Sequence, residues 1–325
     1  MAEPVEPGPA SASPTTAQAE RPGPAATVRR TRGRKGRRPR VNPGWVYAAP
    51  TALFVAVFFI VPVILVIKMS LSDWSLFAGN RGWNAPENYV DAIDMKLFWP
   101  SVAFTVKYTV ITTIILIAIA LGLALLVQEA SRWNSLLRTS FLIPSALGLA
   151  SASLLFYALY APGGPIARVL GWFGIGDGSI SLLGTPNGAL WSTVAVIVWR
   201  FAGFYMLLLM VGLQGIPGDV YEAARVDGAN RFQTFAHITV PLLRPSLALC
   251  TILCVTGSLL AFDQFYILTR GGPDNSTITI VQLIYNVAFQ GRNDLGIAAA
   301  LSIIILLGLI VINVVQFTAL REKEA

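Results

Sequence analysis

Residues 222–245 read EAARVDGANRFQTFAHITVPLLRP and lie between two long apolar runs. The segment is polar and charged, and its spacing is that of two short helices around a central Asp-Gly pair. A plain connection between two spans needs only a handful of residues. A segment of this length and regularity predicts a folded element that a partner contacts outside the membrane.

Long apolar runs fill most of the remaining chain. Of its 325 residues, 54% are hydrophobic and 13% are charged, against about a quarter charged in soluble proteins. A bilayer core of about 30 Å needs roughly 20 apolar residues in a helix, and only helices satisfy the backbone of such runs. Six runs qualify: 47–71, 101–127, 137–160, 190–213, 246–268 and 295–317. The sequence therefore predicts an all-α, polytopic membrane protein with six transmembrane helices.

The distribution of Lys and Arg indicates the orientation. With a cytoplasmic N-terminus, the inside segments hold 16 Lys or Arg and the outside loops hold 5. Positive residues favour the cytoplasmic side. We expect a multi-pass protein of the cell (plasma or inner) membrane, with both termini and the 222–245 segment in the cytoplasm.

The first 44 residues differ from the rest in composition. Residues 1–44 are rich in Pro, Ala, Ser and Arg, and nine Lys or Arg fall within 21–40. We expect a disordered basic cytoplasmic tail that contacts membrane lipid rather than nucleic acid. The transmembrane domain would then cover 45–320, and 321–325 would form the cytoplasmic C-terminus.

The first half of the 222–245 segment predicts a helix and a turn. Val220, Ala223 and Ala224 recur with helical spacing and give a thin, small-residue face. The Asp227-Gly228 pair should break this helix, because Gly accepts a positive φ. Asp227 can then cap the helix that follows.

The second half predicts another short helix. Phe232, Phe235 and Ile238 form its apolar stripe, and Pro241 is expected to end it. Two short helices at an angle beneath a bundle make a rigid lever. An amphipathic hairpin lying on the membrane is the alternative.

Prolines and glycines punctuate the spans. Pro62 should kink the first span where neighbouring groups can satisfy the freed carbonyl. The sequence Gly215-Ile216-Pro217 should stop the fourth span. Pro245 stands where the next helix can begin without losing a needed donor.

The segment resembles the EAA loop of permease subunits of binding-protein-dependent ABC importers, whose pattern is EAAxxDGAxxxxxFxxIxLPxxxP. Val240 stands where Leu is usual. The resemblance implies a coupling loop that spans 218–245 and contacts an ATPase. The residues that match the pattern, and that the resemblance implies are ATPase-coupling residues, are Glu222, Ala223, Ala224, Asp227, Gly228, Ala229, Phe235, Ile238, Pro241 and Pro245.

The resemblance extends across the membrane part. Residues 59–77, 87–105, 212–229 and 262–277 are similar to the branch that imports sugars, oligosaccharides and glycerol phosphates, in particular to its maltose-F-like member. Two departures are Ala85-Pro86, where a Gly is usual, and the intramembrane Lys107.

This resemblance implies a type I ABC importer permease fold and a set of partners. They are a second homologous permease subunit, two ATPase subunits that bind the ATP, and an extracytoplasmic sugar-binding protein. The chain carries no GxxxxGK[ST] phosphate loop, which fits a transporter subunit rather than an enzyme. The sequence offers no catalytic residues, no metal cluster and no cofactor site of its own.

Intramembrane charges and nearby aromatic rings point to a substrate pathway. Charges within spans are costly and usually face a bundle interior or water. Arg200 lies near mid-membrane, and Asp263 could pair with it or with Lys107. The predicted pathway residues are Trp199, Arg200, Phe204, Tyr205, Asp263 and Tyr266, with Phe265 beside them. A structural ion pair and interface aromatics are the alternatives.

Two other functions compete with this interpretation. A self-sufficient secondary carrier or channel would couple through intramembrane carboxylates and often has internal repeats. Here Asp263 stands alone among the acids of the spans, while the cytoplasmic loop is well developed. A membrane-anchored nucleic-acid-binding protein would depend on residues 1–40, whose loss should only disturb insertion in a permease.

Overall fold

The computed structural model describes residues 43–174 and 181–321. Almost all of the predicted basic tail and residues 322–325 of the predicted C-terminus lie outside these residues. The chain divides after Leu53 into two units. The packing described below is that of the second unit, Phe54–Ala325.

Four helices in the described ranges are long and apolar enough to cross a membrane on their own. The first, Tyr47–Ser70, comprises the end of α1 (Pro43–Val55), a π-helical turn η1 (Ala56–Ile60) and α2 (Val61–Ser70). The others are α4 (Phe98–Val127), α8 (Pro186–Gln214) and α15 (Leu295–Arg321). They confirm the first, second, fourth and sixth predicted runs.

Two further spans are bent pairs of helices. The pair of α5 (Arg132–Leu142) with η2 (Ile143–Ala146) meets α6 (Leu149–Leu159) at 94°. The second pair is α10 (Arg231–Thr234), η3 (Phe235–Thr239) and α11 (Val240–Leu242), which meet α12 (Arg244–Leu259) at 67°. By length and composition, counting each pair as one span gives the six that the sequence predicts; the first part of the second pair, Arg231–Leu242, belongs to the segment that was predicted to lie in the cytoplasm.

Two of the predicted runs are wrong as single continuous helices. Run 137–160 is not one straight helix, because Leu147 and Gly148 adopt extended backbone between η2 and α6. Run 246–268 is also interrupted: α12 ends at Leu259, and α13 (Asp263–Leu268) is a separate helix. Hydropathy registers both stretches as apolar but carries no signal for a change of direction.

Short elements connect the spans. One of them, a hairpin that the sequence did not predict, pairs β1 (Ser72–Ser75) with β2 (Gly79–Trp83) in antiparallel fashion. The backbone N–H of Leu76 in its turn donates to the Asn293 carbonyl at 2.8 Å. Two loops that were both predicted to lie outside therefore pack together. The other short elements are α3 (Glu87–Asp94), α7 (Pro165–Trp172), α9 (Gly218–Val226), α14 (Ile280–Tyr285) and η4 (Asn286–Gln290).

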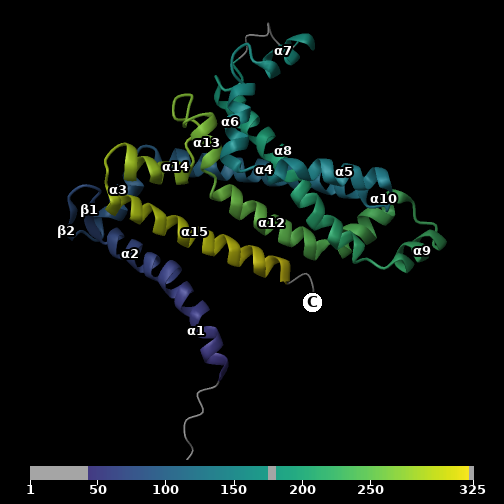
Figure 1. The fold of residues 1–325 in the computed structure, drawn as a ribbon, viewed down its shortest axis with the longest axis horizontal. Helices are drawn as coiled ribbons and strands as arrows, with labels where there is room; N and C mark the ends of the chain where they lie inside the picture. Colours follow the sequence, from purple (N-terminus) through teal and green to yellow (C-terminus); the bar gives the residue numbers. More distant parts are fainter. Residues whose placement is uncertain (1–42, 175–180, 322–325) are drawn as a thin grey trace, which may run out of the picture. The chain divides into compact units, whose positions relative to one another are not determined.

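The core forms where α4 packs along α8 and α12 (Figure 1). Glycines on α8 let its neighbours approach: a Cβ at Gly203 would collide with the Phe141 carbonyl, and one at Gly212 would collide with Ser246. Fully buried side chains of this core include Tyr108, Leu116, Met206, Leu209, Cys250 and Phe265.

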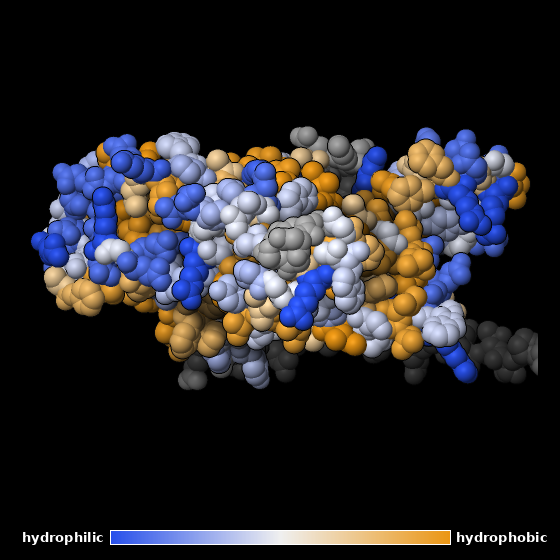
Figure 2. Space-filling view, turned by 90° about the horizontal axis from the view of Figure 1, so that it is seen from above, coloured by the Kyte–Doolittle hydropathy of each residue, from blue (hydrophilic) through white to orange (hydrophobic). Residues whose placement is uncertain are grey.

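Hydrophilic residues gather toward the two ends of the face drawn in Figure 2, and apolar residues are plentiful between them. Side chains such as Ile114 and Val211 are exposed on the outer faces of α4 and α8. A protein in water would not tolerate so much exposed apolar surface, whereas lipid covers it readily.

Two prolines within helices share one structural device. A π-helical turn precedes each: the Val61 N–H bonds the Ala56 carbonyl before Pro62, and the Val240 N–H bonds the Phe235 carbonyl before Pro241. The wider π-helical turn makes room for the proline ring, which would clash with a backbone carbonyl in a regular α-helix. The prediction that Pro241 ends its helix is therefore wrong, since the helix continues to Leu242.

Candidate functional site

The 218–245 segment folds as two short helices joined by a tight turn. As predicted, α8 stops before Gly215, and Pro217 precedes α9. The predicted glycine turn is also present, because Gly228 has φ of 78°. The N–H of Ala229 bonds the Ala224 carbonyl at 2.9 Å, which closes the end of α9.

The second helix has a different cap from the one predicted. Asn230 and Gln233 form a capping box, with two side-chain-to-backbone bonds of 2.9 Å each. Asp227 instead forms the C-terminal boundary of α9. The prediction of an Asp227 cap failed because the turn needs Gly228 and Ala229 before the next helix starts.

The tip of this segment exposes two apolar side chains. Val226 is 88% exposed just before the turn, and Phe232 is 76% exposed just after it. Glu222, Ala223 and Asp227 are exposed beside them. Sequence reasoning placed Phe232 in an apolar stripe and missed Val226, although an apolar residue directly before an Asp-Gly turn was a usable signal.

The remaining motif residues hold the segment together. Ala224 is buried, Phe235 and Ile238 are half-buried, and a 3.3 Å contact joins the Tyr221 and Thr239 hydroxyls across the two helices. As predicted, Pro245 lies in the first turn of α12.

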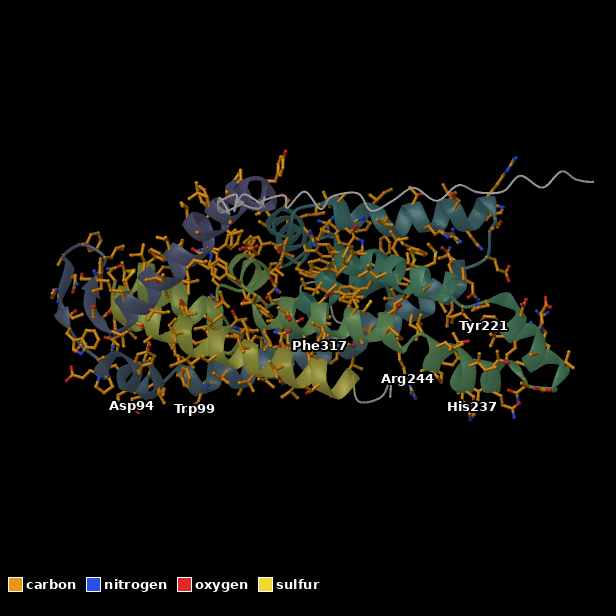
Figure 3. The ribbon with its side chains drawn as sticks, turned by 90° about the horizontal axis from the view of Figure 1, so that it is seen from below. Asp94, Trp99, Tyr221, His237, Arg244 and Phe317 are labelled. Atoms are coloured by element: carbon orange, nitrogen blue, oxygen red, sulfur yellow. The ribbon has the colours of Figure 1, made fainter. Side chains whose placement is uncertain are left out.

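A hollow of about 860 Å³ separates this segment from the end of α4. Glu129, Glu222 and Arg225 contribute charges to its wall. Figure 3 shows Tyr221 and His237 toward one end of the unit, Arg244 inward of them, and Asp94 and Trp99 toward the other end. His237 is exposed on the segment's surface.

A second cavity, of about 320 Å³, lies among α4, α8, α12 and the start of α13. It brings together three of the predicted pathway residues, Phe204, Tyr205 and Asp263. Phe201 and Phe262 also line it and were not predicted.

The other predicted pathway residues lie outside the cavity wall. Trp199 packs against Phe156 with ring centroids 5.0 Å apart, and Tyr266 stacks on Phe262 at 5.1 Å. Phe265 is fully buried.

Arg200 has a role that sequence reasoning missed. Its Nε donates to the Leu147 carbonyl at 2.8 Å, and its guanidinium carbon lies 4.2 Å from the centre of the Phe201 ring. Leu147 lies in the 94° bend, so Arg200 satisfies a carbonyl that no helix satisfies there. Within residues 43–174 and 181–321 the recorded salt bridge joins Arg81 to Asp73. The predicted pairing of Asp263 with Arg200 or Lys107 is therefore wrong.

Residues 114–320 match the family described as binding-protein-dependent transport system inner membrane component. The chain belongs to this family. It is 32% identical over 292 residues to the lactose transport system permease protein LacF of Rhizobium radiobacter, covering 86% of this chain and 95% of LacF. It is 34% identical over 280 residues to the sulfoquinovosyl glycerol transport system permease protein SmoG of Agrobacterium fabrum, covering 85% and 89%.

The fold has a solved counterpart in a bacterial ABC transporter involved in the import of the acidic polysaccharide alginate. The TM-score is 0.76 at 21% identity, over 86% of this chain and 96% of that chain. The predicted importer permease fold is confirmed. The permease is a membrane subunit of a transport system, not an enzyme.

The wall of the permease cavity mixes aromatic and polar groups. Ser258 and Gln264 line it beside Asp263, and the Gln264 Nε2 donates to the Tyr108 hydroxyl at 3.3 Å. The Gln264 Oε1 has no partner among the described side and main chains. Such a wall can stack on one face of a small hydroxylated solute and hydrogen-bond its edge. No group of three or more potential metal ligands occurs in the part of the chain that the structure describes.

Proposed function

We propose that this permease is one of two homologous membrane subunits of an ATP-driven importer for a carbohydrate: a sugar, an oligosaccharide or a glycerol phosphate. The names of its relatives support this substrate class. LacF is named for lactose transport, and the MalF protein of Thermococcus litoralis is named for trehalose and maltose transport. The mixed aromatic and polar cavity wall suits such a solute.

The proposed coupling of this segment to an ATPase subunit depends on the exposed Val226 and Phe232. They flank the Gly228 turn at the end of the unit that carries Tyr221 and His237 (Figure 3). Exposed apolar side chains framed by charged ones are typical of a protein interface. We infer that this tip docks into one of two ATPase subunits, which bind the ATP.

The connections of the segment explain how movement would reach the cavity. It joins α8 through Gly215–Pro217 and runs directly into α12 at Arg244. Those two helices carry much of the cavity wall, with Phe204 and Tyr205 on α8 and Cys254 on α12. A force on the tip would therefore reach two walls of the cavity at once.

The other partners and the topology complete the proposal. An extracytoplasmic sugar-binding protein would deliver the substrate. A solved bacterial alginate ABC transporter, similar in fold, is in complex with an alginate pentasaccharide-bound periplasmic protein. Both termini would lie in the cytoplasm. The placement of the β1–β2 hairpin against Asn293, away from the 218–245 segment, is consistent with this arrangement (Figure 3).

The test changes the two exposed apolar residues at the tip. In the importer purified with its partner subunits, Val226→Asp and Phe232→Asp should each reduce the recovered ATPase and abolish ATP-dependent uptake. His237→Ala, on the exposed surface of the same segment, is the matched control and should leave both unchanged. Full ATPase recovery and uptake in the two Asp variants would contradict the docking role. Uptake without any ATPase would favour a self-sufficient carrier.

A further inference from the structure

We propose that four aromatic rings on α13, α14 and η4 form a second carbohydrate-contacting surface, outside the 320 Å³ cavity. This aromatic platform consists of Phe262, Tyr266, Tyr285 and Phe289. The inference rests on the proposed sugar-import function. It adds residues of the 280–290 region to the surface that contacts the sugar.

The rings of the platform form one continuous group. Phe262 and Tyr266 stack with centroids 5.1 Å apart and planes at 18°. The Tyr285 ring lies 5.2 Å from Phe262 and 5.1 Å from Tyr266, and Phe289 follows at 5.4 Å from Tyr285. Phe262, which caps α13, lies four residues before Tyr266, and Tyr285 at the end of α14 lies four residues before Phe289 in η4.

The platform is accessible. Phe289 is 55% exposed, and Phe262, Tyr266 and Tyr285 are half-buried. Burial of an aromatic ring is favourable, so a ring at a core position would be covered completely. The free surface of these four rings is instead open to a solute, to lipid or to a second subunit.

Polar groups surround the rings. The Gln290 Nε2 donates to the Tyr266 hydroxyl at 2.9 Å. The Asp263 side chain is exposed at the foot of the platform. A sugar presents an apolar ring face and a rim of hydroxyls, which matches a ring surface with donors and acceptors at its edge.

The platform continues into the cavity. Phe262 belongs to both, and Asp263 lines the cavity wall. The Tyr266 N–H bonds the Phe262 carbonyl at 2.9 Å, and α13 then leads toward Arg270, in the loop predicted to lie outside. A solute delivered at that loop would meet the platform first and the cavity next. A packing surface for the second permease subunit would not need this continuity, and we treat it as the competing outcome.

The experiment measures uptake of radiolabelled lactose, trehalose and maltose by cells that carry the complete importer. For any of the three that the unsubstituted importer takes up, Tyr285→Leu and Phe289→Leu should each raise KM at least threefold, with a smaller change in the maximal rate. Tyr285→Phe keeps the ring and should stay within twofold of the unsubstituted KM. Phe317→Leu, which shortens an exposed aromatic residue on α15 (Figure 3), is the matched control and should leave KM unchanged.

Three results would overturn the proposal. One is an unchanged KM in both Leu variants. Another is reduced recovery of the second permease subunit with Tyr285→Leu, which would assign the platform to that interface. The third is absence of uptake of all three disaccharides by the unsubstituted importer, which would exclude these sugars as occupants of the platform and is recognised before any variant is measured.

Discussion

Replacement of Arg200 by Met tests whether this residue holds the bend of the third span. Met keeps an unbranched chain of similar reach but removes the donor to the Leu147 carbonyl and the cation above Phe201. Leu147 begins the break before α6, and Phe201 and Leu149 line the cavity. Arg200 thus connects the bend to the cavity wall without lining the cavity itself.

The expected energetic effect follows from the two contacts. A hydrogen bond from a charged donor contributes about 1.5–3 kcal/mol, and a cation over an aromatic ring contributes about 0.5–1 kcal/mol at partly exposed sites. Arg200 is half-exposed, so the low ends apply and the sum is about 2 kcal/mol. That corresponds to a roughly 30-fold shift between the held and the released bend.

Hydrogen exchange and uptake together provide the assay. In Arg200→Met we expect faster amide exchange in 147–151 and reduced uptake, with unchanged recovery of the ATPase subunits. Arg200→Lys should resemble Met, because an ammonium group cannot reproduce the Nε donor and the flat stacking together. If Lys restored full uptake while Met abolished it, Arg200 would act through its charge on the substrate. If Arg200→Met left amide exchange and uptake unchanged, the contacts of Arg200 with Leu147 and Phe201 would have no role in holding the bend.

Three further experiments have defined outcomes. Gly203→Val should push α8 away from the Phe141 carbonyl and lower the thermal midpoint of the purified importer, at a cost of about 1–3 kcal/mol; an unchanged midpoint would mean that α5 can move aside freely. Gly228→Val should cost at least about 1–2 kcal/mol at its positive φ and uncouple ATP hydrolysis from uptake, whereas Gly228→Asn should retain coupling; equal coupling in both would contradict a required turn. A small methanethiosulfonate should block uptake by modifying Cys254, which lines the cavity. Uptake by the Cys254→Ser variant should therefore resist the reagent, whereas uptake by Cys250→Ser should not. Loss of uptake in the treated Cys254→Ser variant would place the reactive thiol elsewhere.

Sequence reasoning predicted the parts of the fold that depend on local chemistry. Apolar length located the four continuous spans, and Gly215 with Pro217 marked the end of α8. The positive φ of Gly228 and the place of Pro245 in the first turn of α12 follow from backbone preferences of those residue types. Each of these features is decided within a few residues of the chain.

The missed features depend on distant partners. The bend after η2 persists because Arg200, 53 residues away, satisfies the Leu147 carbonyl, and no pattern around Leu147 reports that contact. For the same reason Arg200 was expected to pair with Asp263, since a charge in a span usually calls for a counter-charge. A backbone carbonyl released by a bend is an equally good partner, and only the fold shows which one lies within reach.

The two bent spans have different causes, and the difference bears on function. Near Pro241 the π-helical turn keeps the segment helical up to Leu242, so the 67° change of direction falls at Leu243, between the lever and α12. Leu243 is fully buried, and its N–H bonds the Thr239 carbonyl at 2.9 Å, so this corner is packed and hydrogen-bonded. A stiff corner transmits displacement from the tip into α12, whereas a proline that ended the helix at residue 241 would have left a loose joint. We infer that the proline shapes the lever without breaking it, and that the buried corner would carry movement of the exposed tip into the cavity wall on α12.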